Sequence, residues 1–266
     1  MKLIKRIITG IILTFFLISA LYLGNPYFST GAFVFAVLIM KEILDIQKKS
    51  LFSIESLLSF SAIAFIFYLL TKSTYFWIWS TTMIKIITAL FLLLFLLEVI
   101  TKKYLFKNIS ILIFIKSLGT IIFTFPFLIL TRGTENGILY CLFLFLIVSG
   151  TDIAAYIVGK YFGKYKMSSL SPKKTWEGAV AGLLGALLIA GCYSFYFSTD
   201  LLLTISFGLL LSVIGQFGDL HESLIKREYS VKDSSHILPG HGGIYDRSDS
   251  YLFAFPILFY FGSFFL

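Results

Sequence analysis

Long apolar runs alternate with short polar segments along the whole of this chain. A run of about twenty apolar residues is long enough for a helix to cross the hydrocarbon core of a bilayer. Runs such as ITALFLLLFLLEVI lack the period-two alternation of a barrel strand, and a helix satisfies its own backbone hydrogen bonds in lipid. The pattern therefore predicts an all-α, polytopic helical membrane protein. We expect about nine transmembrane helices, at residues 6–23, 27–44, 51–70, 77–99, 109–130, 136–159, 177–197, 201–222 and 249–266.

The composition agrees with a membrane protein. Hydrophobic residues make up 58% of the 266 residues and charged residues only 14%, so the chain is too apolar for an ordinary soluble domain. The fourth apolar stretch opens with Tyr75, Trp77 and Trp79, which are residue types that concentrate at the headgroup level of a bilayer. Cys141 and Cys192 lie inside apolar runs, so we expect neither a disulfide nor a metal site from them.

The basic residues predict how the chain is oriented in the membrane. With a cytoplasmic N-terminus, 18 of the 22 lysines and arginines lie in inner segments. Lys72 and Arg132 lie in outer loops, and Lys85 and Lys116 lie within spans. This excess follows the positive-inside rule and places the N-terminus in the cytoplasm. Topology then explains the net charge of +8, so a nucleic-acid partner is not expected, although an anionic substrate on the inner face would benefit from it.

The polar residues divide the chain into two parts. Residues 1–130 are predicted to form N-terminal transmembrane helices without signature motifs. Residues 131–266 are predicted to form a C-terminal transmembrane region with enlarged cytoplasmic loops at 160–176 and 223–248, which hold most of the specialised polar residues. Since no internal repeat or low-complexity segment separates the parts, we expect one packed helical domain.

The segment GQFGDLHESLIKREYSVKDSS leads into the second loop and predicts a polar helix face. On a helix, one face collects the residues at i, i+3, i+4 and i+7, namely Asp219, Glu222, Ser223 and Lys226. His221 points away from that face. The LPGHGG segment that follows cannot continue a helix and lets the backbone approach a ligand closely. The last span then opens with Asp246 and Asp249 on one face.

Aspartates at neighbouring helix ends suit a hard cation. Magnesium prefers carboxylate oxygens and completes its coordination with water and substrate phosphates. Lys226 and Arg247 would supply the positive charge that phosphate oxygens require, and glycine N–H groups at 240–243 could form an anion nest. The cluster predicts a metal–polyphosphate site at the membrane surface, although any single aspartate could instead cap a helix or pair with a lysine. Zinc is not expected, because His236 and His241 are not at ligand spacing and have no cysteine nearby.

The first cytoplasmic loop carries a second set of polar residues. Asp152 lies inside the sixth span, where a carboxylate is costly unless it has a partner or a cavity. The segment LSPKKTWEG then places hydroxyls and lysines directly before a helix, namely Ser171, Lys173, Lys174 and Thr175. Such a group predicts an anion site, since free N–H groups and the helix dipole point towards it. The alternative is an ordinary helix cap with positive-inside lysines, and the Walker A pattern is absent.

Other polar and small residues are interpreted as structural. Glu98 is expected to pair with Lys102, four residues away, while Lys116 is expected to extend towards the inner membrane surface. Small residues at every fourth position are typical of close helix packing, within one chain or in a homodimer, and here they are Gly178, Gly182, Ala186 and Ala190.

The two loops together resemble a known family. The sequence SLIKREYSVKDSSHILPGHGGIYDRSD, residues 223–249, is similar to the signature of the phosphatidate cytidylyltransferases (CDP-diacylglycerol synthases). The matching positions are Ser223, Lys226–Arg227, Lys232–Asp233, Pro239–Gly243, Asp246–Arg247 and Asp249. SPKKTWEG also resembles the family's Ser-Pro-x-Lys-Thr element, with Asp152 in the preceding helix, whereas the N-terminal spans carry no signature. Ser248 departs from the pattern, because the family more often has an apolar residue there.

The resemblance implies a nucleotidyltransferase of phospholipid biosynthesis. Its reaction would convert CTP and phosphatidate into CDP-diacylglycerol and pyrophosphate, with one or two Mg²⁺ ions as cofactor. The attacking phosphate monoester has a second pKa of about 6, so it is largely ionised without a strong general base. The harder task is to bring two anions together, which metal ions and basic side chains achieve by neutralising charge. The implied location is the bacterial cytoplasmic membrane, with the active site facing the cytoplasm in a C-terminal catalytic region, and the family also allows a homodimer.

The resemblance also assigns roles to the candidate residues. Asp219 and Asp246 are expected to be the principal metal ligands. Asp249 and Asp152 are expected to be further ligands or to hold the ligands in place. Phosphate binding is expected from basic residues and glycines, namely Lys173, Lys174, Lys226, Arg247, Gly240, Gly242 and Gly243. The hydroxyls expected to orient substrate oxygens are those of Ser171, Ser223 and Thr175. His241 is expected to donate a hydrogen bond rather than to abstract a proton.

Two other kinds of protein fit parts of the pattern. One is another phospho-transferring membrane enzyme, either a CTP-dependent lipid kinase or a CDP-alcohol phosphotransferase, but the Asp-Gly-x-x-Ala-Arg opening of the latter is absent. The other is an ion-coupled transporter that uses Asp152 and Asp219 as coupling carboxylates. Transporters usually show internal pseudo-repeats and midplane sites in broken helices, whereas this chain gathers its polar residues at one face.

Overall fold

Helices account for the regular secondary structure in the part of the chain that the structure describes. The computed structural model describes residues 2–70, 82–103, 105, 110–168, 171–239 and 242–265. The helices are α1 (Lys2–Leu23), α2 (Tyr27–Ile46), α3 (Ile54–Leu70), α5 (Thr82–Thr101), α6 (Ser110–Ile122), α7 (Phe125–Arg132), α8 (Gly137–Phe162), α9 (Trp176–Phe197), α10 (Leu201–Glu228), α11 (Tyr245–Leu252) and α12 (Ala254–Phe265). Strand-like pairing in these ranges is limited to isolated bridges. The all-α prediction is confirmed.

Six helical segments in the described ranges are long and apolar enough to cross a bilayer. They are Tyr27–Ile46, Thr82–Thr101, Leu112–Arg132, Gly137–Phe162, Trp176–Phe197 and Leu201–Glu228. Ile8–Leu23 and Ile54–Leu70 are apolar helices of shorter length. The start of the fourth predicted span, residues 77–81, lies outside the described residues. The chain is therefore a multi-pass helical membrane protein.

Two of the predicted spans are each divided into two helices. The span predicted at 109–130 contains α6 and α7, and the span predicted at 249–266 contains the end of α11 and all of α12. Pro126 lies in the first turn of α7 and Pro256 in the first turn of α12. Proline lacks a backbone N–H, so it is tolerated in a first turn and disruptive further inside a helix. Each new helix therefore begins just before its proline.

Helix α10 is longer than the span predicted at 201–222. Its 28 residues correspond to about 42 Å at 1.5 Å per residue. Because the hydrocarbon core is about 30 Å thick, such a helix extends beyond it by about two turns. The loop predicted at 223–248 thus begins as helix, and Ser223 and Lys226 are held on α10.

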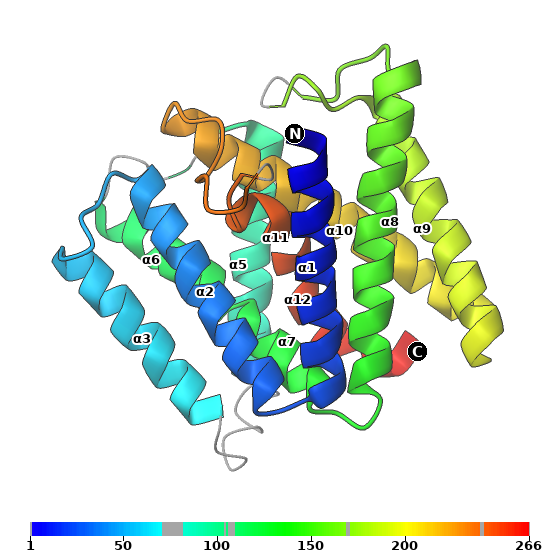
Figure 1. Ribbon diagram of the computed structural model, residues 1–266, viewed down its shortest axis with the longest axis horizontal. Helices are drawn as coiled ribbons and strands as arrows, with labels where there is room; N and C mark the ends of the chain where they lie inside the picture. Colours follow the sequence, from blue (N-terminus) through cyan, green and yellow to red (C-terminus); the bar gives the residue numbers. More distant parts are fainter. Residues whose placement is uncertain are drawn as a thin grey trace.

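Helices α8 and α9 lie side by side along most of their length (Figure 1). A Cβ atom at Gly178 would lie 2.7 Å from the carbonyl oxygen of Ala155 on α8. A Cβ atom at Gly182 would lie 3.0 Å from the side chain of Thr151, and Ala186 on the same stripe is fully buried. The small residues thus permit close packing between two helices of one chain, as the packing interpretation predicts.

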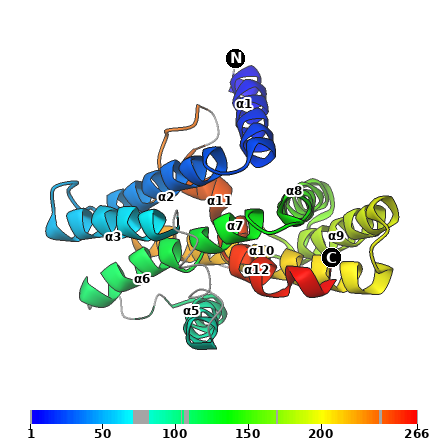
Figure 2. The same cartoon turned by 90° about the horizontal axis from the view of Figure 1, so that it is seen from below.

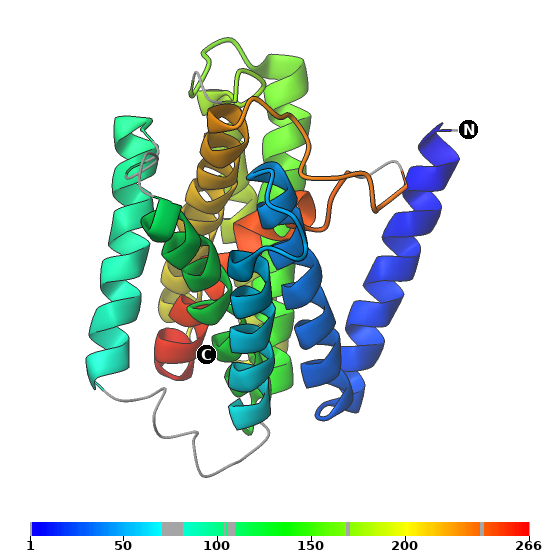
Figure 3. The ribbon, with the colours of Figure 1, turned by 90° about the vertical axis from the view of Figure 1, so that its left-hand side faces the viewer.

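The short helix α11 lies within the bundle, between α2 and α10 (Figure 2). Figure 3 shows α1 leaning away from the other helices, with the segment after α10 reaching across to it. Thr9 Oγ1 donates a hydrogen bond to the carbonyl oxygen of Pro239 (3.2 Å) in that segment. Elements from both halves of the chain therefore surround α11, which carries two of the candidate aspartates.

Candidate active site

Three carboxylates converge where α10 meets α11. Asp219 and Glu222 on α10 and Asp249 on α11 each offer an oxygen atom, and the three oxygens lie within 4.8 Å of one another. Asp219 is half-buried, whereas Glu222 and Asp249 expose only 1% and 8% of their surface. Gly218 permits the approach, because a Cβ atom there would lie 2.5 Å from the Asp249 carbonyl oxygen. We call these three residues the acidic cluster.

The acidic cluster contains more carboxylates than the basic residues that pair with it. Lys226 Nζ lies 2.5 Å from Glu222 Oε2, and Lys174 Nζ lies 2.6 Å from Asp219 Oδ2. Apart from that ion pair, the buried oxygens of Glu222 accept no hydrogen bond within the described residues. Carboxylates packed this closely repel one another, and burial makes the repulsion stronger. An oxygen-only donor set of this kind fits a hard divalent cation such as Mg²⁺.

The loop predicted at 160–176 reaches the acidic cluster through Lys174. Met167 N donates a hydrogen bond to Lys174 O (2.9 Å), and Trp176 N donates one to Tyr165 O (2.9 Å). These bonds join the two arms of the loop directly before α9. The Lys174 ammonium lies against Asp219, so the loop predicted at 160–176 meets α10 at this site.

The other predicted residues of this loop have different surroundings. Thr175 Oγ1 accepts a hydrogen bond from Gly178 N (3.1 Å), so this hydroxyl caps α9 as the capping alternative predicts. Ser171 is half-buried, and its carbonyl oxygen accepts a hydrogen bond from Lys174 N (3.0 Å). Lys173 is exposed. Of these residues, Lys174 is the one that forms an ion pair with the acidic cluster.

Asp152 lies on α8 beside the acidic cluster. Its carboxylate interacts electrostatically with Asp219, Lys174 and Arg247, and its charge also acts on Asp249. The residue is exposed in the isolated chain, unlike the buried members of the cluster. The sixth predicted span therefore brings a fourth carboxylate to the same site.

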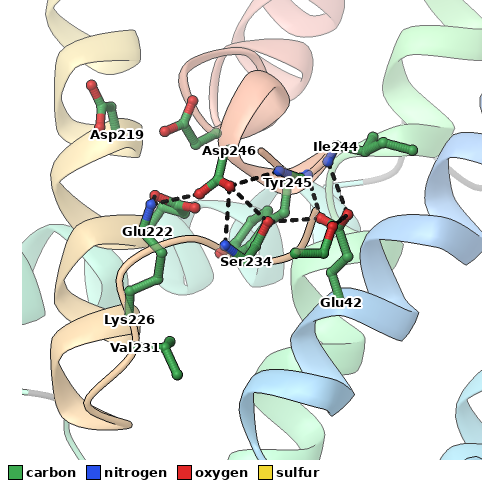
Figure 4. A network of polar contacts seen from close by, with 12 residues as sticks. Glu42, Asp219, Glu222, Lys226, Val231, Ser234, Ile244, Tyr245 and Asp246 are labelled. Carbon is green, nitrogen blue, oxygen red and sulfur yellow. Dashed lines mark hydrogen bonds and ion pairs between the residues drawn. The ribbon is translucent and has the colours of Figure 1, made fainter. Parts of the chain in front are cut away.

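Asp246 belongs to a different network of contacts (Figure 4). Its Oδ1 accepts a hydrogen bond from Lys226 Nζ (2.6 Å), and its Oδ2 accepts from Gly243 N (2.8 Å) and Ser234 N (3.0 Å). Burial acts to raise the pKa of the Asp246 carboxyl, but its hydrogen bonds with neighbouring groups and the charge of Lys226 outweigh burial and lower the pKa to about 2. Asp246 is therefore ionised at neutral pH and anchors the loop before α11. Its role as a principal metal ligand stays a prediction.

Lys226 connects the two networks, because its Nζ lies 2.5 Å from Glu222 Oε2 and 2.6 Å from Asp246 Oδ1. Ser223 is buried on α10, one turn before Lys226. Arg247 is exposed on α11, next to Asp246. Of the predicted basic residues, Lys226 and Lys174 thus pair with the acidic cluster, and Arg247 interacts electrostatically with the neighbouring Asp152.

The glycines of the LPGHGG segment shape the turn before α11. Gly242 has a φ of +86°, which lies in the region that favours glycine. A Cβ atom at Gly243 would lie 1.8 Å from Ser234 Oγ, so only glycine fits there. The N–H of Gly243 is directed to Asp246. Gly240 and His241 lie outside the described residues, and their expected roles stay predictions.

The structure adds a carboxylate that was absent from the candidates predicted from the sequence. Glu42 is fully buried on α2 and accepts hydrogen bonds from Ile244 N (2.9 Å) and Tyr245 N (2.7 Å) at the start of α11. Its position inside the apolar run 27–44 is a usable signal, since a carboxylate in a membrane span is costly without partners. Glu222 was recognised as part of the polar helix face but not as a member of the acidic cluster.

A second buried ionic group corrects two structural expectations. Glu98 forms an ion pair with Lys116 and lies 3.0 Å from His221 Nε2, so it does not depend on Lys102 for a partner. Lys116 is 5% exposed, and its ammonium is held by Glu98 and by the carbonyl oxygen of Leu105 (3.2 Å) instead of extending into solvent. The expected pair with Lys102 on the next turn does not form the main contact of Glu98, because α5, α6 and α10 enclose this carboxylate. A buried charge requires partners that are buried with it. His221 points away from the acidic cluster, as the helix periodicity predicts.

Comparison with known proteins supplies the family. A model described as the cytidylyltransferase family matches residues 4–265. The chain belongs to the cytidylyltransferase family. It is 34% identical over 256 residues to the phosphatidate cytidylyltransferase of Staphylococcus haemolyticus (strain JCSC1435), a match that covers 95% of this chain and 96% of the relative. With the same coverage, it is 33% identical to that of Staphylococcus saprophyticus (strain ATCC 15305) and 34% identical to that of Staphylococcus aureus (strain COL).

Membership of the cytidylyltransferase family confirms the resemblance found in the two loops. The family match also includes the N-terminal spans, which carry no signature motif of their own. It identifies the chain as a nucleotidyltransferase and removes the support for the ion-coupled transporter. The N-terminal helices are therefore part of the family's common architecture, which agrees with the contacts of Glu42 and Glu98 in the structure.

Proposed function

We propose that this membrane protein is a phosphatidate cytidylyltransferase, which converts CTP and phosphatidate into CDP-diacylglycerol and pyrophosphate. The relatives whose matches cover 95% of this chain carry that name. The observation that carries the proposal most directly is the convergence of the acidic cluster with Lys174 from the first cytoplasmic loop. A dense carboxylate group beside basic residues is suited to a reaction between two phosphate-bearing anions.

The proposed cofactor is Mg²⁺, as one or two ions. Asp219, Glu222 and Asp249 would hold it, since their oxygens are close enough to share a cation and the three carboxylates outnumber the two lysines that pair with them. Asp152 and Asp246 are proposed as further ligands or as residues that orient the cluster. When bound, the metal would neutralise the triphosphate and stabilise the charge of the departing pyrophosphate.

The protein's own basic and hydroxyl groups have the task of binding and orienting the substrates. In the proposed reaction a phosphate oxygen of phosphatidate attacks the α-phosphorus of CTP, and the bond to pyrophosphate breaks. Lys174 and Arg247, with Lys173 and Lys226, are proposed to bind phosphate oxygens. No general base is required, because the attacking phosphate has a second pKa of about 6. The hydroxyls of Ser171, Ser223 and Thr175 are proposed to orient oxygens. The backbone N–H groups of Gly240 and Gly242 are proposed to bind phosphate and the His241 side chain to donate a hydrogen bond, whereas the Gly243 N–H is already directed to Asp246.

We further propose that the chain crosses the bilayer about nine times with its N-terminus and active site on the cytoplasmic side. The distribution of lysine and arginine along the sequence supports this orientation. The bacterial relatives support a cytoplasmic membrane location. CTP would then arrive from the cytosol, while the lipid enters sideways from the bilayer into a C-terminal catalytic region at 131–266. A homodimer is part of the same proposal.

The test is an assay of the purified protein in detergent micelles with phosphatidate and CTP labelled at the α-phosphorus. The expected result is a labelled CDP-lipid, formed with Mg²⁺ and lost when the metal is chelated. A matched reaction with CTP labelled at the γ-phosphorus should release labelled pyrophosphate. Transfer of the γ-label to the lipid, without a CDP-lipid, would identify a CTP-dependent lipid kinase instead.

A further inference from the structure

Glu42 has an unusual position for a carboxylate in an apolar helix. It lies on α2, in the half of the chain without signature motifs, and none of its surface is exposed. Yet Figure 4 shows its side chain directed at the start of α11, the helix that carries Asp246 and Asp249. A carboxylate buried in this way is costly unless polar groups surround it. The polar groups around the Glu42 carboxylate therefore indicate what this residue does at the site.

Four donors surround the Glu42 carboxylate. The backbone N–H groups of Ile244 and Tyr245 donate to Oε1 (2.9 Å) and Oε2 (2.7 Å) respectively. The hydroxyls of Ser235 and Ser234 donate to Oε1 (2.5 Å) and Oε2 (2.9 Å). The two N–H groups belong to the first turn of α11, where a negative charge is favoured by the helix dipole. Glu42 thus caps α11 from another helix and ties down the preceding loop.

The same contacts lead directly to Asp246. Ser234 Oγ lies 2.9 Å from Glu42 and 3.1 Å from Asp246 Oδ2, so one hydroxyl touches both carboxylates. Gly243 fits between them, because a Cβ atom there would lie 2.6 Å from Glu42 Oε2. Asp246 in turn binds Lys226, which pairs with the acidic cluster. A displacement at Glu42 would therefore shift the beginning of α11 and the carboxylates that this helix carries.

We propose that Glu42 is a positioning residue for cytidylyl transfer. It fixes the N-terminus of α11 and the serine pair at 234–235, so that Asp246 and Asp249 face α10 at the distance that a shared cation requires. It does not itself touch substrate or metal. The inference rests on the proposed function and extends it, because it assigns the N-terminal half of the chain a part in the geometry of the site.

The principal test is Glu42→Gln, which keeps the size of the side chain and replaces one acceptor oxygen by an amide donor. That NH₂ group would face N–H and O–H donors, so the start of α11 should be displaced. We expect kcat to fall by about 10- to 100-fold and the Mg²⁺ concentration for half-maximal activity to rise severalfold. KM for CTP should change by less than about threefold, since Lys173 and Lys174 lie on another loop. A purely structural role would lower the melting temperature and leave the Mg²⁺ dependence unchanged.

The matched control is Glu55→Gln, which removes the same charge from the same half of the chain. Glu55 lies at the start of α3 and pairs with Lys49 (2.7 Å), away from the α10–α11 junction. This variant should keep the kcat and the Mg²⁺ dependence of the unmodified protein. Ser235→Ala is the milder second variant and removes one of the four donors. It should lower kcat by about two- to fivefold, and in combination with Glu42→Gln the losses should be less than multiplicative.

Hydrogen–deuterium exchange gives a readout that needs neither substrate nor metal. Measured in chelator, the amides of Ile244 and Tyr245 should exchange at least about tenfold faster in Glu42→Gln than in the unmodified protein. The proposal is overturned if a folded Glu42→Gln protein keeps its kcat, its Mg²⁺ dependence and its amide protection. If Glu42→Gln fails to fold, unchanged kcat and exchange in Ser235→Ala overturn it instead. If the unmodified protein makes no CDP-lipid, the proposed function fails, while the exchange data still decide whether Glu42 holds α11.

Discussion

The two faces of α10 bury charge in opposite ways. One face presents Asp219 and Glu222 to Asp249, so that three carboxylates meet while only two lysines pair with them. The other face presents His221 to Glu98, whose two carboxylate oxygens pair with Lys116 Nζ and with His221 Nε2. A cavity of about 330 Å³ beside His221 is lined almost entirely by apolar side chains of α5, α10 and α12.

The difference separates a site for chemistry from a site for packing. A balanced buried ion pair has little to gain from a further ligand, and breaking it leaves an uncompensated charge. An unbalanced cluster costs stability until a cation arrives, so it persists where binding is its use. Since both groups depend on the same helix, substitutions on its two faces should affect activity and stability separately.

The largest effect is expected from the acidic cluster. Asp219→Asn should lower kcat by about a thousandfold, because it removes a charged oxygen ligand from the site. Its melting temperature should stay equal or rise, since the substitution relieves repulsion among the carboxylates. Both are measured on the detergent-purified protein, by CDP-lipid formation and by thermal unfolding. Retention of more than a tenth of the normal kcat would show that the cluster is not the reaction site.

Substitutions beside the opposite face of α10 should mainly change the stability of the protein. Glu98→Ala is expected to lower the free energy of unfolding by about 3 kcal/mol, because it leaves the Lys116 ammonium buried without its partner. Activity per folded molecule should stay within about threefold of normal. Replacing both partners by apolar residues, as in Glu98→Leu with Lys116→Met, should recover most of the loss in chemical denaturation. A large fall in kcat with unchanged stability would contradict the division between the two faces.

A smaller effect is expected where the first loop meets the cluster. Lys174→Ala should lower kcat/KM for CTP by about 30-fold, equivalent to about 2 kcal/mol, because its ammonium is held against Asp219. Lys173→Ala should cost less than about fivefold, since this lysine is exposed beside the same turn. Steady-state kinetics at several ionic strengths would compare them. Equal losses in the two variants would show that general positive charge, rather than the position of Lys174, is what matters.

The smallest expected change concerns how closely α10 and α11 approach. Gly218→Ala places a Cβ atom 2.5 Å from the Asp249 carbonyl oxygen and should cost about 1–2 kcal/mol of stability. It should also raise the Mg²⁺ concentration for half-maximal activity by about two- to fivefold. Gly191→Ala is the control, because a Cβ atom there meets nothing within 4 Å. Stability and Mg²⁺ titrations that do not distinguish the two variants would argue against a tightly held α10–α11 junction.

Local patterns in the chain were sufficient for its class and for its helix faces. Apolar runs identify membrane helices because each helix satisfies its backbone bonds internally. The spacing of Asp219, Glu222 and Lys226 places them on one face and His221 on another, since 3.6 residues complete a turn. The breaks at Pro126 and Pro256 were also readable from the residue type, although the predicted spans ran through them.

The contacts that each candidate carboxylate makes depend on how distant parts of the chain pack together. By itself the sequence determined that this is a helical membrane protein of the cytidylyltransferase family, because periodicity and motif spacing are properties of short segments. Only the tertiary structure decided that Asp249 joins the acidic cluster while Asp246 anchors a loop. It also decided that Glu42, about 200 residues earlier, caps α11. The packing of whole helices determines which distant residues become partners. A pattern of neighbouring residues in the sequence does not contain the distances between helices.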